Sequence, residues 1–548
     1  MEVQLKSAVK RILENRGISA AGVAEYLSDT PKISYDPFLM KNMNEACDVI
    51  LSAIEDGTKI CVYGDYDTDG VTSVTVLTDV IGEIGGDVTY YIPSRFDEGY
   101  GLNAVALDRI KEQGYGLVIT VDCGCTSVKE VEHAKSIGLD IIITDHHELK
   151  EEVPDCLVID PKQKDCEYPC KFLAGVGVAF KVAQALCTIT GMPKRVLTRN
   201  LDMVGIGTIG DIVPLLDENR TLAKFGLRAI NISERPGLRA LIEGVGFKRG
   251  EIDSQRISFG IVPHINASGR MGKASYAVKL MKTSREDKAV ELVNQLKEYN
   301  YDRKRVQGDT AEKCETMVTP QMLERGAILL KLEDAHEGVI GIVCGKLKDN
   351  HKMPVLLVAK TEDGNWKGTG RSVDGIDIFK ILKNREKLFL RFGGHAAACG
   401  FTITEENLPL LEAHLYDSIA KLREAGEIPD QSLKAEIDLE PEEVCFDFID
   451  EQKLMEPFGK SNPKPLVGIR MKCSGIARMG ADGRFLRFIG KLANGNTIRA
   501  VDFRNGDRSE EIIRRAEFAD EEVYVVGILE EQLWNGNRYL QININHVE

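Results

Sequence analysis

The sequence predicts an α/β protein in which two sheet-containing domains are followed by a small β-barrel. From Lys59 onward, short apolar runs alternate with amphipathic stretches of ten or more residues. This alternation predicts a mostly parallel sheet with helices on both faces. A second, shorter alternation begins near Gly326, and five short strand-like segments follow Pro457. Five short strands with one helical stretch among them are typical of a small barrel of the OB type.

Length and composition narrow the class of protein. A chain of 548 residues is too long for one hydrophobic core and predicts three or four domains. No apolar run approaches the roughly 18 residues of a membrane span, and the N-terminal segment lacks the apolar core of a secretion signal, so we expect a cytoplasmic protein. The 13 cysteines are scattered and lack zinc-site spacing, which suits reduced thiols. The net charge of −15 argues against nonspecific coating of nucleic acid, but it does not exclude a local basic channel.

The expected elements of the first half follow in chain order. Residues 1–45 form a short helical segment, and residues 46–280 form the first α/β domain. A long polar helix, 281–325, then connects to the second domain, and we expect it to be interrupted or strained near Gly308. In the first domain we expect strands at 59–64, 87–93, 116–124, 138–143 and 156–161, with helices at 71–84, 103–113 and 127–137.

Acidic and imidazole side chains follow three of these strands. The carboxyl ends of parallel strands meet at one edge of a sheet, so these side chains can converge on one crevice. Adjacent histidines cannot share a face of a regular strand, so the pair must sit where the strand ends. Taken alone, the pair fits a solvated strand-to-loop junction equally well. The candidates are Asp65, Asp67, Asp69, Asp122, Asp145, His146 and His147, with Asp211 after the glycine-rich run GIGTIG.

This set of side chains predicts a metal centre. Packed carboxylates repel one another unless a cation compensates them. Oxygen and imidazole ligands without thiolates suit manganese or magnesium better than zinc. Two such ions, roughly 3.5–4 Å apart, can activate water and stabilise the leaving oxygen in phosphoester hydrolysis. A calcium loop is excluded because Val76 stands where its twelfth-position acid belongs, whereas a helix N-cap at Asp69 stays plausible.

The motifs GDYDTDGVTS, VDCG and TDHHE, in this order, resemble the signatures of the DHH phosphoesterase superfamily. IPSRFDEGYGLN and PHINASGRMG resemble the RecJ branch, whose members are single-strand-specific 5′-to-3′ DNA exonucleases. The resemblance runs from about Lys59 to the C-terminus. It implies that Asp67, Asp122, His146 and Asp211 are direct metal ligands. It further implies that Asp65, Asp69 and His147 ligate or support the ions, while Asp145 could ligate or hold an imidazole.

The second domain, 326–427, carries the expected substrate-binding residues. We expect strands at 327–332, 353–360 and 365–372, and a helix at 338–350. Adjacent glycines let backbone N–H groups approach a phosphate, although GGH alone favours a tight turn with a core histidine. The resemblance to a DHH-associated domain implies that Arg371, Ser372, Gly393, Gly394 and His395 face the substrate. Arg95 and Arg270, assisted by Asn266, are candidates for contacts with the 5′-terminal phosphate or the backbone; surface or interdomain salt bridges are the alternative.

The last module, 428–548, begins with a linker and continues as the OB-type barrel. Such barrels commonly bind single strands through basic residues and stacked aromatic rings. Because strand residues alternate faces, some of the aromatic residues must lie in the core. The candidates are Arg484, Phe485, Arg487, Phe488, Arg499, Phe503, Trp534 and Tyr539.

Taken together, these features predict a metal-dependent 5′-to-3′ exonuclease on single-stranded DNA that uses two Mn²⁺ or Mg²⁺ ions, releases 5′-mononucleotides and acts in DNA repair and recombination. Specificity for single strands would come from a passage too narrow for a duplex, and Asp122→Ala would abolish hydrolysis while leaving the fold intact. Expected partners are single-stranded DNA, a single-strand-binding protein and a recombination helicase. The alternatives are a hydrolase of short oligonucleotides or cyclic dinucleotides, and an inactive replication scaffold, which would have lost some of these acids.

Overall fold

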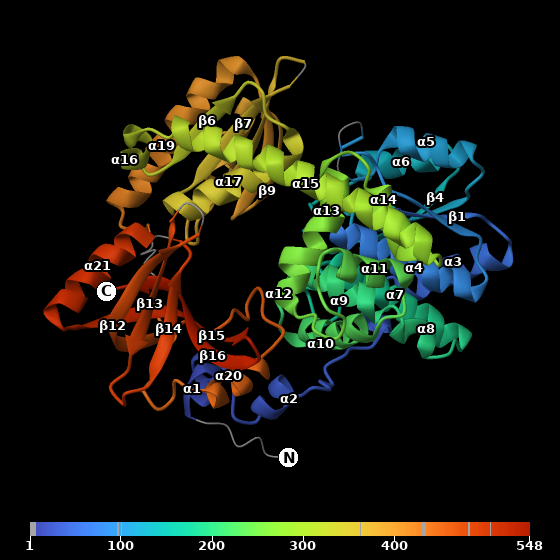
Figure 1. The fold of residues 1–548 in the computed structure, drawn as a ribbon. Helices are drawn as coiled ribbons and strands as arrows, with labels where there is room; N and C mark the ends of the chain where they lie inside the picture. Colours follow the sequence, from blue (N-terminus) through green and yellow to red (C-terminus); the bar gives the residue numbers. More distant parts are fainter. Residues whose placement is uncertain are drawn as a thin grey trace.

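The computed structural model describes residues 7–95, 98–99, 101–361, 363–428, 434–480, 483–504 and 506–548. Two α/β domains and a barrel are arranged in a ring, with a long helix connecting the first two (Figure 1). The expected fold class is confirmed, while the exact domain boundaries stay predictions. Among the described residues, no helix has the length and apolar character needed to cross a membrane.

The first domain is built on a five-stranded parallel sheet of order β2-β1-β3-β4-β5. Alternate residues of its strands face different cores: Val62 packs with α3, α4 and α7, whereas Cys61 packs with α5 and α6. These helices lie on opposite sides of the sheet (Figure 1). The strands are β1 Ile60–Gly64, β2 Val88–Tyr91, β3 Leu117–Val121, β4 Asp140–Thr144 and β5 Leu157–Ile159.

The helices of the first domain continue well beyond the sheet. Gly205 and Gly226 let α9 and α10 touch, since a Cβ on Gly205 would lie 2.6 Å from the Gly226 Cα. The helices are η1 Pro37–Leu39, α3 Met43–Glu55, α4 Thr68–Ile84, α5 Ala104–Glu112, α6 Val128–Ser136, α7 Gly175–Thr190, α8 Arg195–Thr198, α9 Leu201–Gly210, α10 Asp217–Ile232, α11 Pro236–Gly244, α12 Ser254–Arg256, the π-helical turn η2 Ile257–Ile261, α13 Val262–Arg270 and α14 Ser275–Lys282.

The connection to the second domain is one unbroken helix of 32 residues, α15 Glu286–Met317, followed by the short α16 Pro320–Arg325. The expected interruption near Gly308 is therefore wrong. Gly308 is exposed, with open space where a side chain would stand. Glycine in a helix interior costs about 1 kcal/mol relative to alanine. The packing of the buried residues Leu292, Leu296 and Ala311 on the same helix outweighs that cost.

The second domain has a mixed sheet of order β6-β7-β8-β10-β9. Only β6 and β7 are parallel; β8, β10 and β9 follow as antiparallel neighbours. The expected helix after the first strand is confirmed as α17. The elements are β6 Ile328–Leu332, α17 Glu337–His351, β7 Val355–Lys360, β8 Trp366–Arg371, α18 Ile378–Lys383, η3 Glu386–Leu388, β9 Phe389–His395, β10 Ala398–Ile403, η4 Glu405–Asn407 and α19 Leu408–Glu424.

The barrel contains the five expected strands and the helical stretch between them. Its sheet runs β11-β12-β13-β14-β16-β15 and closes through pairing of β12 with β15. Of the expected linker, 428–439, residues 429–433 lie outside the described residues, and Ile437–Asp438 form the short strand β11. The elements are β11 Ile437–Asp438, α20 Phe446–Lys453, β12 Val467–Met479, β13 Phe485–Lys491, β14 Thr497–Asp502, α21 Gly506–Ala519, β15 Glu522–Trp534 and β16 Asn537–Val547.

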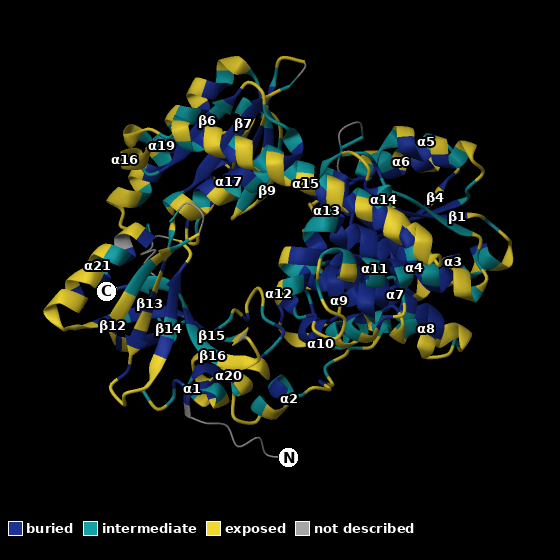
Figure 2. Ribbon diagram, viewed as in Figure 1, coloured by how far each residue is buried: buried dark blue, intermediate teal, exposed yellow. Residues whose placement is uncertain are grey.

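The N-terminal helices α1 Ser7–Asn15 and α2 Val23–Leu27 pack on the barrel, next to α20 (Figure 1). Val9, Ile12 and Leu13 are fully buried in the core that also contains Phe448. The helices of the first domain are buried toward the sheet and exposed on their outer faces (Figure 2). The start of the chain thus belongs to the last core, which the sequence pattern did not indicate.

Candidate active site

The carboxyl ends of β1, β3 and β4 bring the acidic motifs to one edge of the first sheet. The register pairs Gly64 with Val121 and Val121 with Thr144, so the three strands end level with one another. The histidine pair follows directly where β4 ends, as the alternation argument requires. Ligand atoms lie within 4.8 Å of one another in three overlapping groups: Asp65–Asp67–Asp122, Asp69–His146–Asp211 and Asp122–Asp145–His146–His147.

His146 stands among three carboxylates. Its Nε2 lies 3.1 Å from Asp122 Oδ1, 3.6 Å from Asp211 Oδ2 and 3.7 Å from Asp69 Oδ2. Burial, together with the neighbouring charge of His147, lowers the pKa of His146 to about 3. The imidazole is therefore neutral at physiological pH, which is the form that ligates a metal ion.

His147 has the opposite character. Its Nδ1 lies 2.7 Å from Asp145 Oδ1. Burial disfavours the imidazolium, but the hydrogen bond with Asp145 and the charge of that carboxylate raise the pKa of His147 to about 9. Although burial opposes it, the same pairing lowers the pKa of Asp145. The two adjacent histidines thus differ in charge. His146 is a neutral imidazole that can ligate a metal ion, and His147 is a cation paired with Asp145.

The remaining carboxylates carry uncompensated charge. Burial first, and neighbouring carboxylates second, raise the pKa values of Asp65, Asp69 and Asp122 well above their ordinary range and that of Asp211 to about 7. Asp65 Oδ1 is buried without a hydrogen-bond partner among the described residues. A divalent cation would satisfy that oxygen and the excess charge together. Carboxylates plus one imidazole form the donor set preferred by manganese or magnesium, so these residues fit such ions.

In the metal-free protein, the free energy of unfolding is expected to fall as the pH rises from about 4 to about 7. The pKa of Asp211 rises from 3.8 to about 7 on folding, so the metal-free folded chain holds a proton that the unfolded chain has lost. Where the folded state binds more protons, the free energy of unfolding decreases with increasing pH. Thermal unfolding in chelator and in Mn²⁺, at pH 5 and pH 7, checks this. Mn²⁺ should raise the midpoint more at pH 7; an equal rise at both would contradict the assignment.

Backbone groups hold the first acidic motif in place. Both oxygens of Asp69 accept hydrogen bonds at the start of α7, from Gly175 N at 2.6 Å and Val176 N at 2.8 Å. The N-cap of α4 is Asp67, which accepts from Asp69 N and Gly70 N. The expectation that Asp69 is the cap is therefore wrong, because Asp69 reaches another helix 106 residues away in the sequence.

Gly175→Ala is expected to lower kcat/KM by about 10²-fold, because small displacements of reacting groups cost that much. An alanine Cβ at this position would lie 2.7 Å from the Asp122 Cβ and 2.9 Å from its Oδ1, so Asp122 must move. Single-turnover rates measure the effect. Gly308→Ala, where a Cβ meets open space, is the matched control and should leave the rate unchanged. Wild-type turnover by Gly175→Ala would show that the position of Asp122 does not matter.

The three residues expected from the RecJ-like motifs lie around Tyr66 and Thr68 of the first acidic motif. The guanidinium of Arg95 stacks over the Tyr66 ring at 5.2 Å. Burial, reinforced by the charge of Arg95, lowers the pKa of Arg270 to about 10, and its Nη1 donates to Gly338 O at 3.0 Å, linking the two α/β domains. Asn266 Oδ1 accepts from both the amide and the hydroxyl of Thr68 at 2.8 Å. Asn266 therefore positions the first acidic loop.

The candidates of the second domain lie on β8 and on the β9–β10 hairpin. Arg371 Nη1 donates to Thr369 Oγ1 and Gly370 O at 3.1 and 2.8 Å. Ser372 is buried, and its Oγ has no partner among the described residues. A Cβ on Gly394 would collide with Ala398 O at 2.4 Å, whereas Gly393 faces open space. His395 is exposed at the end of β9, so the alternative of a core histidine is wrong.

The aromatic and basic candidates of the barrel divide as alternation requires. Phe488 is 1% exposed and belongs to the core, which removes it from the binding set. Phe503 is 47% exposed, and its ring meets that of Phe485 edge-on at 5.4 Å. Arg484 lies over Phe485, and Arg499 lies over Tyr539 at 4.0 Å. Arg487 is exposed on β13, and the side chain of Trp534 lies outside the described residues.

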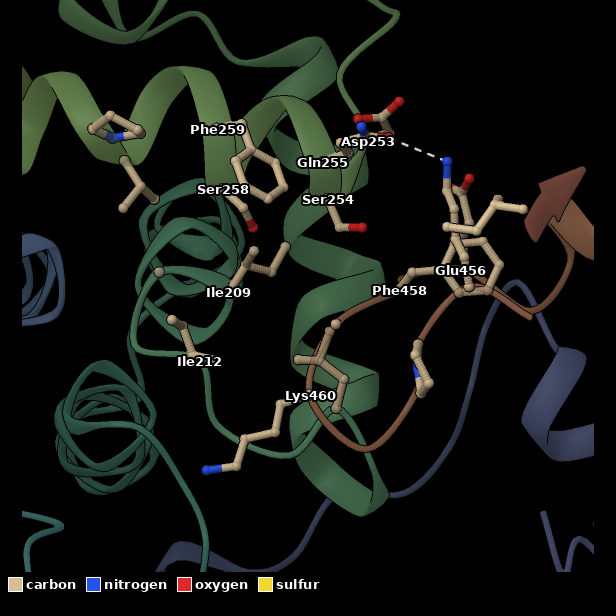
Figure 3. Close-up of a pocket in the computed structure, with 18 of the residues that line it drawn as sticks. Ile209, Ile212, Asp253, Ser254, Gln255, Ser258, Phe259, Glu456, Phe458 and Lys460 are labelled. Carbon is tan, nitrogen blue, oxygen red and sulfur yellow. Dashed lines mark hydrogen bonds between the residues drawn. The ribbon is translucent and has the colours of Figure 1, made fainter. Parts of the chain in front are cut away.

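A cavity of about 880 Å³ lies between the first domain and the barrel (Figure 3). Its walls include the expected residues Asn266 and Arg270, but most lining residues were not predicted. Phe259 is 79% exposed on the π-helical turn η2, and Ile212, next to Asp211, is 65% exposed with a φ of +58°. Single π turns are frequent at functional sites. Sequence offers little signal here, because an apolar side chain held in solvent is visible only once the fold is known.

Three family models match consecutive parts of the chain. The DHH family N-terminal domain matches residues 59–208, the DHHA1 domain matches residues 325–421, and the RecJ OB domain matches residues 435–546. These segments coincide with the first sheet, the second sheet and the barrel.

Similar proteins and structures extend the match over nearly the whole chain. The single-stranded-DNA-specific exonuclease RecJ of Bacillus subtilis is 36% identical, across 99% of this chain and 68% of that protein. RecJ of Escherichia coli is 30% identical, across 85% of this chain and 84% of that protein. The crystal structure of RecJ in complex with Mn²⁺ from Thermus thermophilus aligns with a TM-score of 0.82 at 31% identity, covering 98% of this chain and 75% of that one.

Proposed function

The chain belongs to the RecJ family of single-stranded-DNA-specific exonucleases, and from this premise we propose that it is a metal-dependent exonuclease that digests single-stranded DNA from the 5′ end and releases 5′-mononucleotides. The observation that carries the proposal is the cluster of buried carboxylates around neutral His146. Burial raises the pKa values of these carboxyls, so bound cations would favour their charged form, and clustered carboxylates suit phosphoester hydrolysis.

The ligand assignment rests on the family resemblance, and the three groups of neighbouring ligand atoms support it. Asp67, Asp122, His146 and Asp211 are the proposed direct ligands, and Asp122 belongs to two of these groups. Asp65, Asp69 and His147 ligate or support: Asp69 is held by α7, and His147 is paired with Asp145. Two bound divalent ions would supply activation of water and stabilisation of the leaving oxygen.

The chain's own cations neutralise and orient the phosphate. Arg270 keeps its charge at neutral pH, because even its lowered pKa is about 10. A guanidinium binds two phosphate oxygens at once, and Arg95 stands close enough to Arg270 to depress its pKa. Both arginines lie beside Tyr66, a residue of the first acidic loop. These arginines are proposed to hold the reacting phosphate against the acidic edge of the sheet.

Polarity is proposed to come from the second domain. Arg371, the free Ser372 hydroxyl and the glycines of the β9–β10 hairpin offer donors for a terminal phosphate. The link from Arg270 to Gly338 fixes this domain against the first one. We further propose that a passage between the two α/β domains admits one strand but not a duplex, and that the exposed ring of Phe503 supplies a surface for bases.

The proposal is tested with three substrates in Mn²⁺ or in chelator: a long single strand, the same sequence as a blunt duplex, and a dinucleotide. We expect Mn²⁺-dependent release of mononucleotides from the long single strand and little from the duplex. Digestion of the dinucleotide alone would indicate a hydrolase of short oligonucleotides. Tight binding without hydrolysis would indicate an inactive scaffold.

Family membership also supports a cellular role in DNA repair and recombination in the cytoplasm. A single-strand-binding protein and a recombination helicase are the proposed partners. Stimulation of digestion on a single strand pre-coated with the binding protein would support the first partnership, and inhibition would oppose it.

A further inference from the structure

The turn of residues 457–464, between α20 and β12, packs on the segment of the first domain that follows Asp211. Leu215, four residues after Asp211, donates its backbone N–H to Lys460 O at 2.9 Å. Gly459 packs so closely on the same residue that a Cβ would lie 2.7 Å from Leu215 Cδ1. Lys460 extends from this turn beneath Ile212 (Figure 3). Its ammonium group has no hydrogen-bond or ion-pair partner among the described residues.

A buried asparagine makes this turn rigid. Asn462 is fully buried, and its Nδ2 donates to Met455 O at 2.9 Å and Pro457 O at 2.8 Å. Its Oδ1 accepts from Arg16 Nη1 and from the Tyr26 hydroxyl, both at 2.6 Å. The N-terminal helices therefore hold the turn.

Arg220 fastens the same assembly to the first domain. It stacks on Tyr26 at 3.9 Å and donates to Met455 O and Glu456 O at 3.1 Å. A lysine on a rigid turn, such as Lys460, loses less conformational entropy on binding than a lysine on a mobile loop.

Lys460 lines the cavity between the first domain and the barrel, together with the proposed substrate contacts Asn266 and Arg270. Lys464, at the end of the same turn, is by contrast paired with Glu530 at 2.5 Å and donates to Gln255 at 3.1 Å. An ammonium group without a partner among the described residues, in a cavity that Arg270 and Arg303 also line, is placed to bind an anion.

We propose that Lys460 contacts the substrate, binding one backbone phosphate of the single strand where it passes through the cavity between the first domain and the barrel. The inference rests on the proposed function and deepens it, because the barrel side of the molecule would then complete a site that the two α/β domains form. The ligand class is a phosphodiester, recognised by charge and without base specificity.

The test compares Lys460→Met and Lys460→Arg with Lys421→Met, an exposed lysine on α19. We expect Lys460→Met to lower kcat/KM on a long single strand about tenfold, mainly through KM. Loss of one phosphate contact should also reduce the slope of log KM against log salt by about 0.7. Lys460→Arg should restore most of both effects, and Lys421→Met should change neither.

A charge scan identifies the phosphate. Oligonucleotides with one neutral methylphosphonate, at each linkage from the 5′ end in turn, are used as competitors of digestion. At one linkage the neutral group should weaken inhibition of the wild type but not of Lys460→Met. An unchanged salt slope, or equal losses in both proteins at every linkage, would overturn the inference. Failure of the wild type to digest from the 5′ end would instead refute the proposed function.

Discussion

Asp122→Asn is expected to lower kcat/KM for single-stranded DNA by at least about 10³-fold while raising the thermal stability of the metal-free protein. The activity falls because Asp122 belongs to two of the ligand groups and removal of one preorganised charge costs at least this much. Burial and neighbouring acids raise the pKa of this carboxyl, so its charged form destabilises the metal-free fold. Asparagine removes that charge, and the stability of the metal-free protein therefore rises. Asparagine is preferred to alanine because residue 122 has a φ of +60°, which asparagine tolerates better.

The matched control is Asp155→Asn, whose carboxylate is 94% exposed and paired with Lys135 at the surface. It should leave both activity and the unfolding midpoint unchanged. Initial rates in Mn²⁺ and melting curves in chelator provide the two measurements. Near-normal turnover by Asp122→Asn in excess Mn²⁺ would contradict the metal assignment, and a lower melting midpoint in chelator would contradict the electrostatic account of the cluster.

Lys181→Met is expected to destabilise the folded protein by about 3–5 kcal/mol, because it leaves a buried carboxylate without its cation. Lys181 and Glu218 are both fully buried and 2.5 Å apart, joining α7 to α10. Glu218 also accepts from the Tyr168 hydroxyl and from Ser34 and Tyr35, so one acid links four segments. Denaturant unfolding gives the free energy.

Two further variants separate the causes of that loss. The double substitution Lys181→Met with Glu218→Gln should recover part of the stability, because the uncompensated charge is then removed. Lys135→Met, at a surface pair, should leave the unfolding midpoint unchanged. A Lys181→Met protein as stable as wild type would show that the buried pair contributes nothing to the fold.

The acidic side chains at the sheet edge could be predicted because their position depends only on where each strand ends in the sequence. A buried run such as KICVYG must be a strand, and parallel strands that end level place whatever follows them at one edge. The same reasoning located Asp65, Asp122 and the histidine pair. The different characters of His146 and His147 could not be predicted, because they depend on which neighbour each ring meets after the strand ends.

The parts that sequence did not predict depend on packing between distant segments. The N-terminal helices join the barrel because Ile12 and Leu13 pack into its core, and nothing in their own pattern identifies that partner. Asn266 supports Thr68 across 198 residues. The helix interruption predicted at Gly308 was wrong because helix propensity is a weak constraint on a helix whose other residues are packed against neighbouring elements. Lys460 stood in a turn-rich stretch with no chemical pattern of its own.

We propose that the buried carboxylates and His146 hold metal ions that remove nucleotides from the 5′ end of a single strand. The most direct test is digestion of a long single strand labelled at either end, in Mn²⁺ and in chelator, with products followed over time. We expect the 5′ label to be released at once as a mononucleotide, the 3′ label to stay in shortening fragments, and chelator to stop both. Early release of the 3′ label, or equal digestion in chelator, would contradict the proposed function.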